Sequence, residues 1–243
     1  MKIHKKIANL FGFELIPFSR FPSIEGHIKA IIKHFDINLI IDIGANTGQY
    51  ASMLRKRVGY RGDIHSFEPV PDVYRQLEKN SSHDTHWYTH QIALGDQDSE
   101  KKIHVTRSSD YSSFLTPNDN SRRLRENDTI ISKSETVKIK RLDEYLLQTM
   151  SDFGPDNHRI YLKLDTQGYD LVAMRGCLGL LKNIKAIQTE LSFLPIYIDM
   201  PDYIESLQYY RNIGFAPSGF HPVSREPESM QLIEADCILV KTS

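Results

Sequence analysis

Short, uniformly apolar runs alternate along this chain with segments in which apolar residues recur every three or four positions. A run that is apolar at nearly every position is typical of a strand buried on both faces of a parallel sheet, as at 38–43. Ile28, Ile31, Ile32 and Phe35 follow instead the spacing of one helix face. The patterns predict strands at 38–43, 63–68, 86–93, 159–165, 185–190, 214–216 and 235–240, and helices within the first forty residues and at 47–58, 71–80, 170–181 and 201–212.

The middle of the chain has a different pattern. Residues 102–106 and 136–140 alternate between apolar and polar side chains, which predicts half-exposed strands, and the residues between them are rich in Ser, Asn, Asp and Arg. We interpret 100–140 as an insertion with a polar loop or lid. Its arginines at 122, 123 and 125 are expected in solvent, with the binding of an anionic substrate as the alternative. The order β-α-β-α-β before it is half of a Rossmann-like unit, so we predict one open α/β sheet preceded by a helical segment at 1–38.

Composition and charge narrow the class of protein. The 243 residues are 40% hydrophobic and carry 30 Lys and Arg against 31 Asp and Glu, a formal net charge of −1. Proteins that bind nucleic acid through its phosphates usually have a basic excess, so we expect no nucleic-acid partner. The two cysteines form neither a disulfide framework nor a zinc motif, which favours a reducing compartment and predicts a cytoplasmic protein.

No apolar stretch reaches the roughly 18 residues that a membrane span needs. The basic, partly apolar start of the chain resembles a signal peptide, but Glu14 interrupts the apolar run and no small-residue cleavage site follows cleanly. We therefore expect a surface helix there.

The sharpest candidate site is the turn Asp42-Ile-Gly44-Ala-Asn46-Thr-Gly48-Gln-Tyr50, between a predicted strand and a predicted helix. Backbone N–H groups at a helix start can bind a ligand, and glycines leave room for its close approach. Glu68 ends the next strand, twenty residues after Gly48. A carboxylate there can accept hydrogen bonds from both hydroxyls of a ribose.

Two ribose-containing cofactors compete for this site. A dinucleotide such as NAD favours G-x-G-x-x-G, but Asn46 replaces the central glycine and the Asp42 carboxylate would repel a pyrophosphate. S-adenosylmethionine (SAM) has a cationic amino group and a sulfonium that this carboxylate would attract. SAM is the predicted cofactor; an NAD- or nucleotide-sugar-binding oxidoreductase is the alternative, and a catalytically inactive binding subunit is a third reading.

A family resemblance is carried by five motifs in this order: the turn Asp42–Tyr50, Phe67-Glu68-Pro69, Ala93-Leu-Gly95, Leu142-Asp143 and Lys163-Leu-Asp165-Thr-Gln-Gly168-Tyr-Asp170. Together they closely resemble the FkbM family of class I SAM-dependent methyltransferases, from about Leu39 to Val240. The resemblance implies a methyltransferase domain at 39–243 with a Rossmann-like, doubly wound seven-stranded sheet whose last strand is antiparallel. It also implies O-methylation of a hydroxyl on a sugar, glycan or polyketide-type acceptor. Many relatives have Glu where this chain has Asp170, so the orientation of a neighbour held by this carboxylate could differ.

The predicted cofactor site combines the turn, the strand-end carboxylate, two apolar residues and a serine: Asp42, Gly44, Asn46, Gly48, Tyr50, Glu68, Ile92, Ala93 and Ser113. The turn, with the Asp42 carboxylate, is expected to face the methionyl end of SAM. Glu68 is expected to bind the ribose, and the apolar pair the adenine. Ser113, with Ser112, resembles a serine pair that lies close to the cofactor in the family.

Methyl transfer to a hydroxyl requires a base, which we expect at the carboxyl edge of the sheet. Asp165 ends one predicted strand, Glu190 ends the next, and His221 follows in a predicted loop, so these are the candidate catalytic residues. The carboxylates could instead hold a divalent metal, as in the similar catechol O-methyltransferases, but no closed metal motif is present and none is predicted. Tyrosines at 111, 169 and 197 would suit stacking on a sugar ring.

Overall fold

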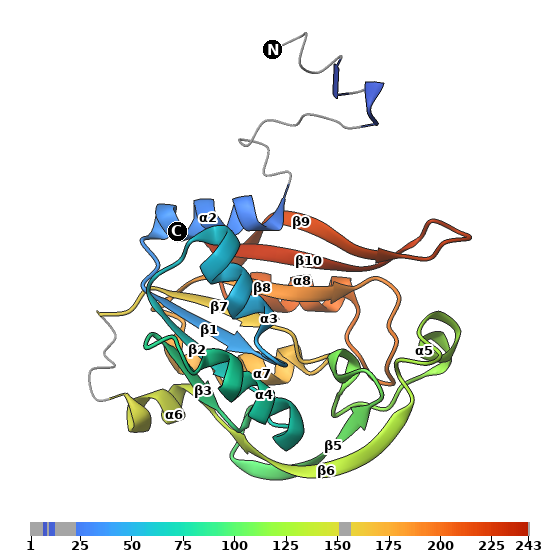
Figure 1. Cartoon of the computed structure of the whole chain (residues 1–243), viewed down its shortest axis with the longest axis horizontal. Coiled ribbons are helices and arrows are strands. Elements are labelled where there is room, and N and C mark those ends of the chain that lie inside the picture. Colours follow the sequence, from blue (N-terminus) through green and yellow to red (C-terminus); the bar gives the residue numbers. More distant parts are fainter. Residues whose placement is uncertain (1–6, 9, 13–22, 151–156, 243) are drawn as a thin grey trace.

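The central element of the molecule is a seven-stranded sheet (Figure 1). Its strands are β1 (Leu39–Ile43), β2 (Asp63–Phe67), β3 (Trp87–His90), β7 (Ile160–Leu164), β8 (Ile184–Ser192), β9 (Phe215–Arg225) and β10 (Leu232–Lys241). They lie in the order β3-β2-β1-β7-β8-β10-β9, and β10 runs in the opposite direction to the other six strands. The computed structural model describes residues 7–8, 10–12, 23–150 and 157–242. The predicted doubly wound sheet with an antiparallel last strand is confirmed.

Helices cover both faces of this sheet. One face packs against α2 (Ile24–Phe35), α3 (Gln49–Met53), the π-helical turn η2 (Leu54–Val58) and α4 (Pro71–Ser81). The other packs against α6 (Leu142–Thr149), α7 (Asp170–Arg175), the 3-10 turn η4 (Leu178–Leu180) and α8 (Tyr203–Asn212). Successive strand residues supply the two cores: Ile40 lies in the first and Ile41 in the second.

The N-terminal helical prediction is met in part by α2, whose first turn is capped by Ser23. The interpretation of Glu14 lies outside the described residues. Among the described residues, no helix combines the length and the apolar character that a bilayer crossing would need.

The insertion forms a second, three-stranded sheet beside the first. β4 (Ala93–Leu94), β5 (Ser99–Thr106) and β6 (Ile131–Lys140) pair in the order β4-β6-β5. The 3-10 turn η3 (Ser109–Tyr111) and the helix α5 (Asp119–Leu124) lie between β5 and β6. The alternating segments predicted as strands are therefore the parts of β5 and β6 that pack over a small apolar core.

Three element predictions are wrong in detail. The single strand expected at 86–93 is two strands in different sheets, because the chain leaves β2 after His90 and pairs with β6 from Ala93. The helix expected at 47–58 becomes π-helical after Met53. The helix expected at 170–181 ends at Arg175 and is followed by the 3-10 turn η4, with the chain passing close to Gly95 at Gly176. A Cβ there would lie 1.9 Å from the carbonyl oxygen of Gly95.

The topology determines where a ligand can bind. β1 pairs with β2 on one side and with β7 on the other, so the strand order reverses between β1 and β7. Ligands of open α/β sheets bind outside the carboxyl ends of the strands at such a switch point. The insertion lies over this edge.

Candidate active site

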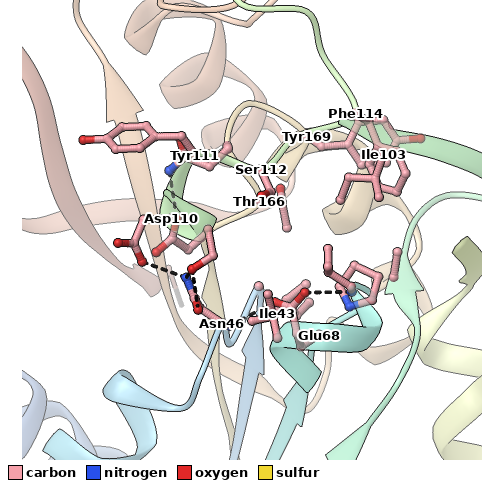
Figure 2. A pocket seen from close by; sticks show the side chains of 18 of the residues that line it. Ile43, Asn46, Glu68, Ile103, Asp110, Tyr111, Ser112, Phe114, Thr166 and Tyr169 are labelled. Carbon is pink, nitrogen blue, oxygen red and sulfur yellow. Dashed lines mark hydrogen bonds between the residues drawn. The ribbon is translucent and has the colours of Figure 1, made fainter. Parts of the chain in front are cut away.

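A cavity of about 380 Å³ opens between the carboxyl ends of the parallel strands and the insertion. In Figure 2 its apolar side chains Ile103, Phe114 and Tyr169 lie together, across the cavity from Asn46 and Asp110. Its lining combines an apolar side with several carboxylates and amides, the usual construction of a small-molecule site.

The carboxylate of Glu68 is held in place by the backbone at the wall of this cavity. Its Oε2 accepts a hydrogen bond from the N–H of Asn46 (3.1 Å) and its Oε1 from the N–H of Val70 (2.8 Å). Burial raises the pKa of Glu68 to about 7, against the effect of these two hydrogen bonds. Each oxygen retains a lone pair for a ligand hydroxyl, so the carboxylate is preorganised as an acceptor.

Asn46 connects the turn to the insertion. Its Nδ2 donates to Asp110 Oδ1 (2.7 Å) and to Ser109 Oγ (3.1 Å), as Figure 2 shows. We call these contacts the Asn46 latch. The backbone of Asn46 is left-handed (φ 47°), a conformation that Asn tolerates better than most residues. Asn46, which stands where a dinucleotide-binding motif has its central glycine, thus holds the insertion over the cavity by hydrogen bonds.

Asp42 does not face the cavity, which corrects its predicted cofactor role. It is fully buried, and the ammonium of Lys163 lies 3.3 Å from its Oδ1. Ser66 Oγ donates to its other oxygen (3.3 Å). Lys163 also lies 3.1 Å from Asp165, and these carboxylates raise its pKa although burial opposes the charge. The cation that Asp42 attracts is therefore a lysine of this chain.

Both glycines of the turn are required by packing within the protein. Gly44 has φ 77°, and a Cβ there would lie 1.9 Å from the carbonyl oxygen of Asp165. A Cβ at Gly48 (φ 91°) would lie 2.6 Å from the ring of Trp87. Gly44 still lines the cavity through its backbone, whereas Gly48 does not.

Three further carboxylates line the cavity: Asp165 directly follows β7, Glu190 lies near the end of β8, and Glu234 lies near the start of β10. Gln167 Nε2 lies 3.3 Å from both Asp165 Oδ1 and Glu190 Oε2 and links the two predicted catalytic residues. Burial and the neighbouring Asp165 raise the pKa of Glu190 well above its usual value. Glu234, which the sequence reasoning missed, accepts from Ser224 Oγ (2.9 Å) and lies 3.9 Å from Arg125. Because the last strand, β10, is antiparallel, its first residues lie at the edge of the sheet where the parallel strands end. The predicted antiparallel strand could therefore have indicated Glu234 as a site residue.

Of the other residues predicted to bind the cofactor, some line the cavity and some lie outside it. Ile92 and Ala93 line the cavity. Ser112 does too, but Ser113 is buried behind the wall and donates to the carbonyl of Gln167 (2.7 Å). Tyr50 lies outside this cavity, with its hydroxyl donating to Gln188 (2.7 Å).

The tyrosines that were expected to stack on a sugar and the arginines of the insertion also differ in whether they line the cavity. Tyr111 and Tyr169 line the cavity, but Tyr197 is buried, with its hydroxyl 2.7 Å from the Tyr111 carbonyl. Arg125, expected in solvent, lines the cavity as well. Arg122 and Arg123 are exposed and pair with Asp119 and Glu226.

His221 is not in a loop at the strand edge, and this prediction is wrong. It lies within β9, opposite Asp236 of β10, because that strand continues to Arg225. Its Nε2 is 3.0 Å from Nδ1 of His27 in α2, and it does not line the cavity.

Asp170 orients Thr166, which lines the cavity. The Asp side chain, although shorter than the Glu of many relatives, is long enough for these contacts. It accepts hydrogen bonds from the backbone N–H (2.7 Å) and the hydroxyl of Thr166, and its other oxygen accepts from Thr189 (3.1 Å). Thr166 lines the cavity beside Asp165. Within the described ranges, no group of three or more His, Cys, Asp or Glu side chains is placed to hold a metal ion.

A Rossmann-like sheet with a cavity at its switch point is typical of enzymes that bind a nucleotide-containing cofactor. A family model described as the methyltransferase FkbM domain matches residues 42–217. The chain belongs to this family of class I SAM-dependent methyltransferases, and its cofactor is SAM. No curated protein sequence matches the chain.

Solved structures of several methyltransferases are similar in fold only. Magnesium protoporphyrin IX methyltransferase from Synechocystis PCC 6803, with bound SAM, is 6% identical, with a TM-score of 0.47 over 90% of this chain and 79% of that one. Precorrin-6y C5,15-methyltransferase from Geobacter metallireducens is 10% identical, with a TM-score of 0.47 over 90% and 88%. An rRNA methylase from Streptococcus thermophilus is 7% identical, with a TM-score of 0.43 over 90% and 96%.

Proposed function

We propose that this methyltransferase transfers the methyl group of SAM to a hydroxyl of a sugar, glycan or polyketide-type acceptor. The observation that carries the proposal is a single cavity that is lined in one part by a carboxylate suited to a ribose and in another by carboxylates suited to a reacting hydroxyl. Glu68, held by two backbone N–H groups, suits the hydroxyls of a ribose, while Asp165 and Glu190 suit a hydroxyl that must lose its proton.

The cofactor site that we propose fits the residues present. Glu68 binds the ribose, and the apolar walls around Ile92 and Ala93 take the adenine. The backbone of Gly44 and the amide of Asn46 border the methionyl end. Bound SAM supplies a methyl group activated by a positively charged sulfur. The protein's share is to orient the acceptor oxygen, exclude water and accept a proton.

Asp165 is the proposed base. It lies at the cavity, and its ion pair with Lys163 fixes the carboxylate in position. Asp165 would accept the proton that the acceptor hydroxyl loses when its oxygen takes the methyl group and S-adenosylhomocysteine leaves. Burial raises the pKa of Glu190 well above its usual value, which favours the protonated form, a hydrogen-bond donor. These assignments give the two carboxylates different roles.

Calorimetry and product analysis test this function. We expect binding of SAM and S-adenosylhomocysteine but not of NAD or NADH. Incubation with SAM carrying an isotopically labelled methyl group should yield labelled methyl ethers, identified by NMR. Binding of NAD without binding of S-adenosylhomocysteine would favour the oxidoreductase. Binding of SAM with no transfer to any hydroxyl would favour an inactive subunit. Transfer only to nitrogen or carbon would contradict O-methylation.

We also propose the cytoplasm as the compartment and a small-molecule or glycan hydroxyl as the partner. The proposal for the compartment is supported by the two cysteines, Cys177 and Cys237, which are both buried and form no disulfide with each other.

A further inference from the structure

A second cavity, of about 320 Å³, lies beside the first. Gly44, Asn46, Asp110 and Asp165 line both cavities and form the partition between them. The new walls come from α3, through Tyr50 and Met53, and from the sheet, through Gln188 and Asp236. A molecule in the second cavity would therefore meet a molecule in the first at Asp165, the proposed base.

Three of the side-chain donors of the second cavity, Gln188, Lys163 and Asn46, are already engaged within the protein. Gln188 donates through Nε2 to Asp236 Oδ1 (3.1 Å), and its Oε1 accepts from the hydroxyl of Tyr50 (2.7 Å). The ammonium of Lys163 is shared between Asp42 and Asp165. The amide of Asn46 is engaged in the latch. These contacts leave carboxylate oxygens and the exposed amide of Gln49 as the available polar groups of the wall.

Asp236 is the clearest of these acceptors. Among the described residues, its side chain makes one hydrogen bond, the one from Gln188 to Oδ1, which fixes the carboxylate and leaves Oδ2 available. Burial raises the pKa of Asp236 to about 6, so it is ionised at neutral pH. Asp110 likewise uses one oxygen for the latch. Two carboxylates from different elements thus present oxygens to one space, as the recognition of neighbouring hydroxyls requires.

The other walls suit a ring with both polar and apolar surface. Tyr50 is fixed by its hydrogen bond to Gln188 and by the ammonium of Lys163, 5.1 Å from its ring centroid. Met53 adds an adaptable apolar contact. Phosphates and carboxylates are disfavoured here. Asp110, Asp165 and Asp236 are negative, and Lys163, the cation of the described wall, is already paired.

We propose that the second cavity is the acceptor subsite and that it takes an uncharged, polyhydroxylated ring free of phosphate, with Asp236 as a specificity-determining residue. This inference rests on the proposed function, because it places the reacting hydroxyl at Asp165. It excludes sugar phosphates and nucleotide sugars whose phosphates would lie in this cavity.

The experiment compares three sets of probes: methyl glycosides of neutral hexoses, the corresponding hexose 6-phosphates, and hexuronic acids. Transfer is followed as release of S-adenosylhomocysteine, and binding by saturation-transfer NMR with S-adenosylhomocysteine present. The test variant is Asp236→Asn, which keeps size and an oxygen for Gln188. The control is Asp199→Asn, an exposed position that lines neither cavity. SAM affinity is measured for each protein by calorimetry.

We expect the methyl glycosides to bind and to be methylated. Asp236→Asn should raise the acceptor KM by about 10- to 100-fold, the equivalent of one hydrogen bond to a charged group, with SAM affinity unchanged. Asp199→Asn should behave as the unmodified protein. Preference for the phosphates or uronic acids, an unchanged KM in Asp236→Asn, or no binding of any glycoside while SAM binds would overturn the inference. Absence of SAM binding would instead contradict the proposed function itself.

Discussion

At the scale of single residues, the buried pair of Asp42 and Lys163 is the most consequential contact of the site. The side chain of Asp42 is 0% exposed and that of Lys163 is 8% exposed. A buried ion pair is a weak source of net stability, but losing one partner leaves an uncompensated charge in the interior. This pair therefore supports the turn and positions Asp165 rather than binding the cofactor.

Lys163→Met should destabilise the fold by about 3–5 kcal/mol, because Asp42 would lose its counter-charge. The double variant Asp42→Asn/Lys163→Met removes both charges and should recover part of this loss. Urea unfolding of the two single variants and the double variant measures the coupling. Equal stability of Lys163→Met and the double variant would show that Asp42 does not depend on Lys163.

Glu68→Ala should weaken SAM binding by about 1.5–3 kcal/mol, the contribution of hydrogen bonds to a charged group. The pKa of Glu68 is raised to about 7, chiefly by burial, and ribose hydroxyls prefer the carboxylate. SAM affinity should therefore rise up to about tenfold per pH unit below pH 7 and level off above it. Calorimetry between pH 6 and 8 measures both effects.

The pH dependence of SAM affinity should disappear in Glu68→Ala. The matched control is Glu78→Ala, which removes an exposed carboxylate of α4 and should keep both the affinity and its pH dependence. A pH dependence that persists in Glu68→Ala would assign it to another group.

Asp165→Asn should lower the turnover number by about 10²–10⁴-fold, the typical contribution of a positioned base. SAM affinity should change little, because Asp165 faces the acceptor in the proposed arrangement. Steady-state kinetics and calorimetry on the same preparation separate the two effects. A turnover number equal to that of the unmodified protein would remove Asp165 from catalysis.

At the scale of elements, the sequence predicts most of the fold because central strands such as β1 and β7 are apolar at nearly every position, and because the helices have apolar residues at helical spacing. The antiparallel last strand was predicted only from the family resemblance, because apolar periodicity does not reveal which strands pair or in which direction they run. The break between β3 and β4 escaped prediction for the same reason. Within the site, carboxylates at strand ends could be predicted. The burial of Asp42 under Lys163 and the extension of β9 past His221 depend on tertiary packing.

The element that the sequence predicts least well, the insertion, is fastened to the sheet by the Asn46 latch. Asp110→Ala removes its shorter hydrogen bond and should weaken SAM binding by several-fold, mainly through faster dissociation, because closing elements retain bound ligands. Asp110→Asn keeps an oxygen that can accept from Asn46 and is the matched control. Stopped-flow measurement of SAM dissociation tests this. Equal dissociation rates in Asp110→Ala and the unmodified protein would exclude a latch.

At the scale of the whole molecule, stability between pH 4.5 and 6.5 depends on buried groups with opposite effects. Burial lowers the pKa of His65 to about 4 and that of His90 to about 3. The unfolded chain then binds more protons than the folded one below pH 6.5, so acidification destabilises the protein. Glu68 has the opposite effect: its pKa of about 7 lies above the ordinary value of 4.5, so acidification through this range stabilises the fold.

His65→Phe separates these opposing contributions. His65 is 4% exposed, and its Nδ1 lies 3.0 Å from His90 Nε2, with Asp63 and His158 as further titratable neighbours. As pH falls from 6.5 to 4.5, the unmodified protein should lose stability relative to His65→Phe by about 1.4 kcal/mol per pH unit, since the variant has no imidazole to charge there. Urea unfolding at three pH values measures this difference. His34→Phe, at an exposed position of α2, should show no such trend. A constant difference between His65→Phe and the unmodified protein would mean that His65 is protonated equally in the folded and unfolded states.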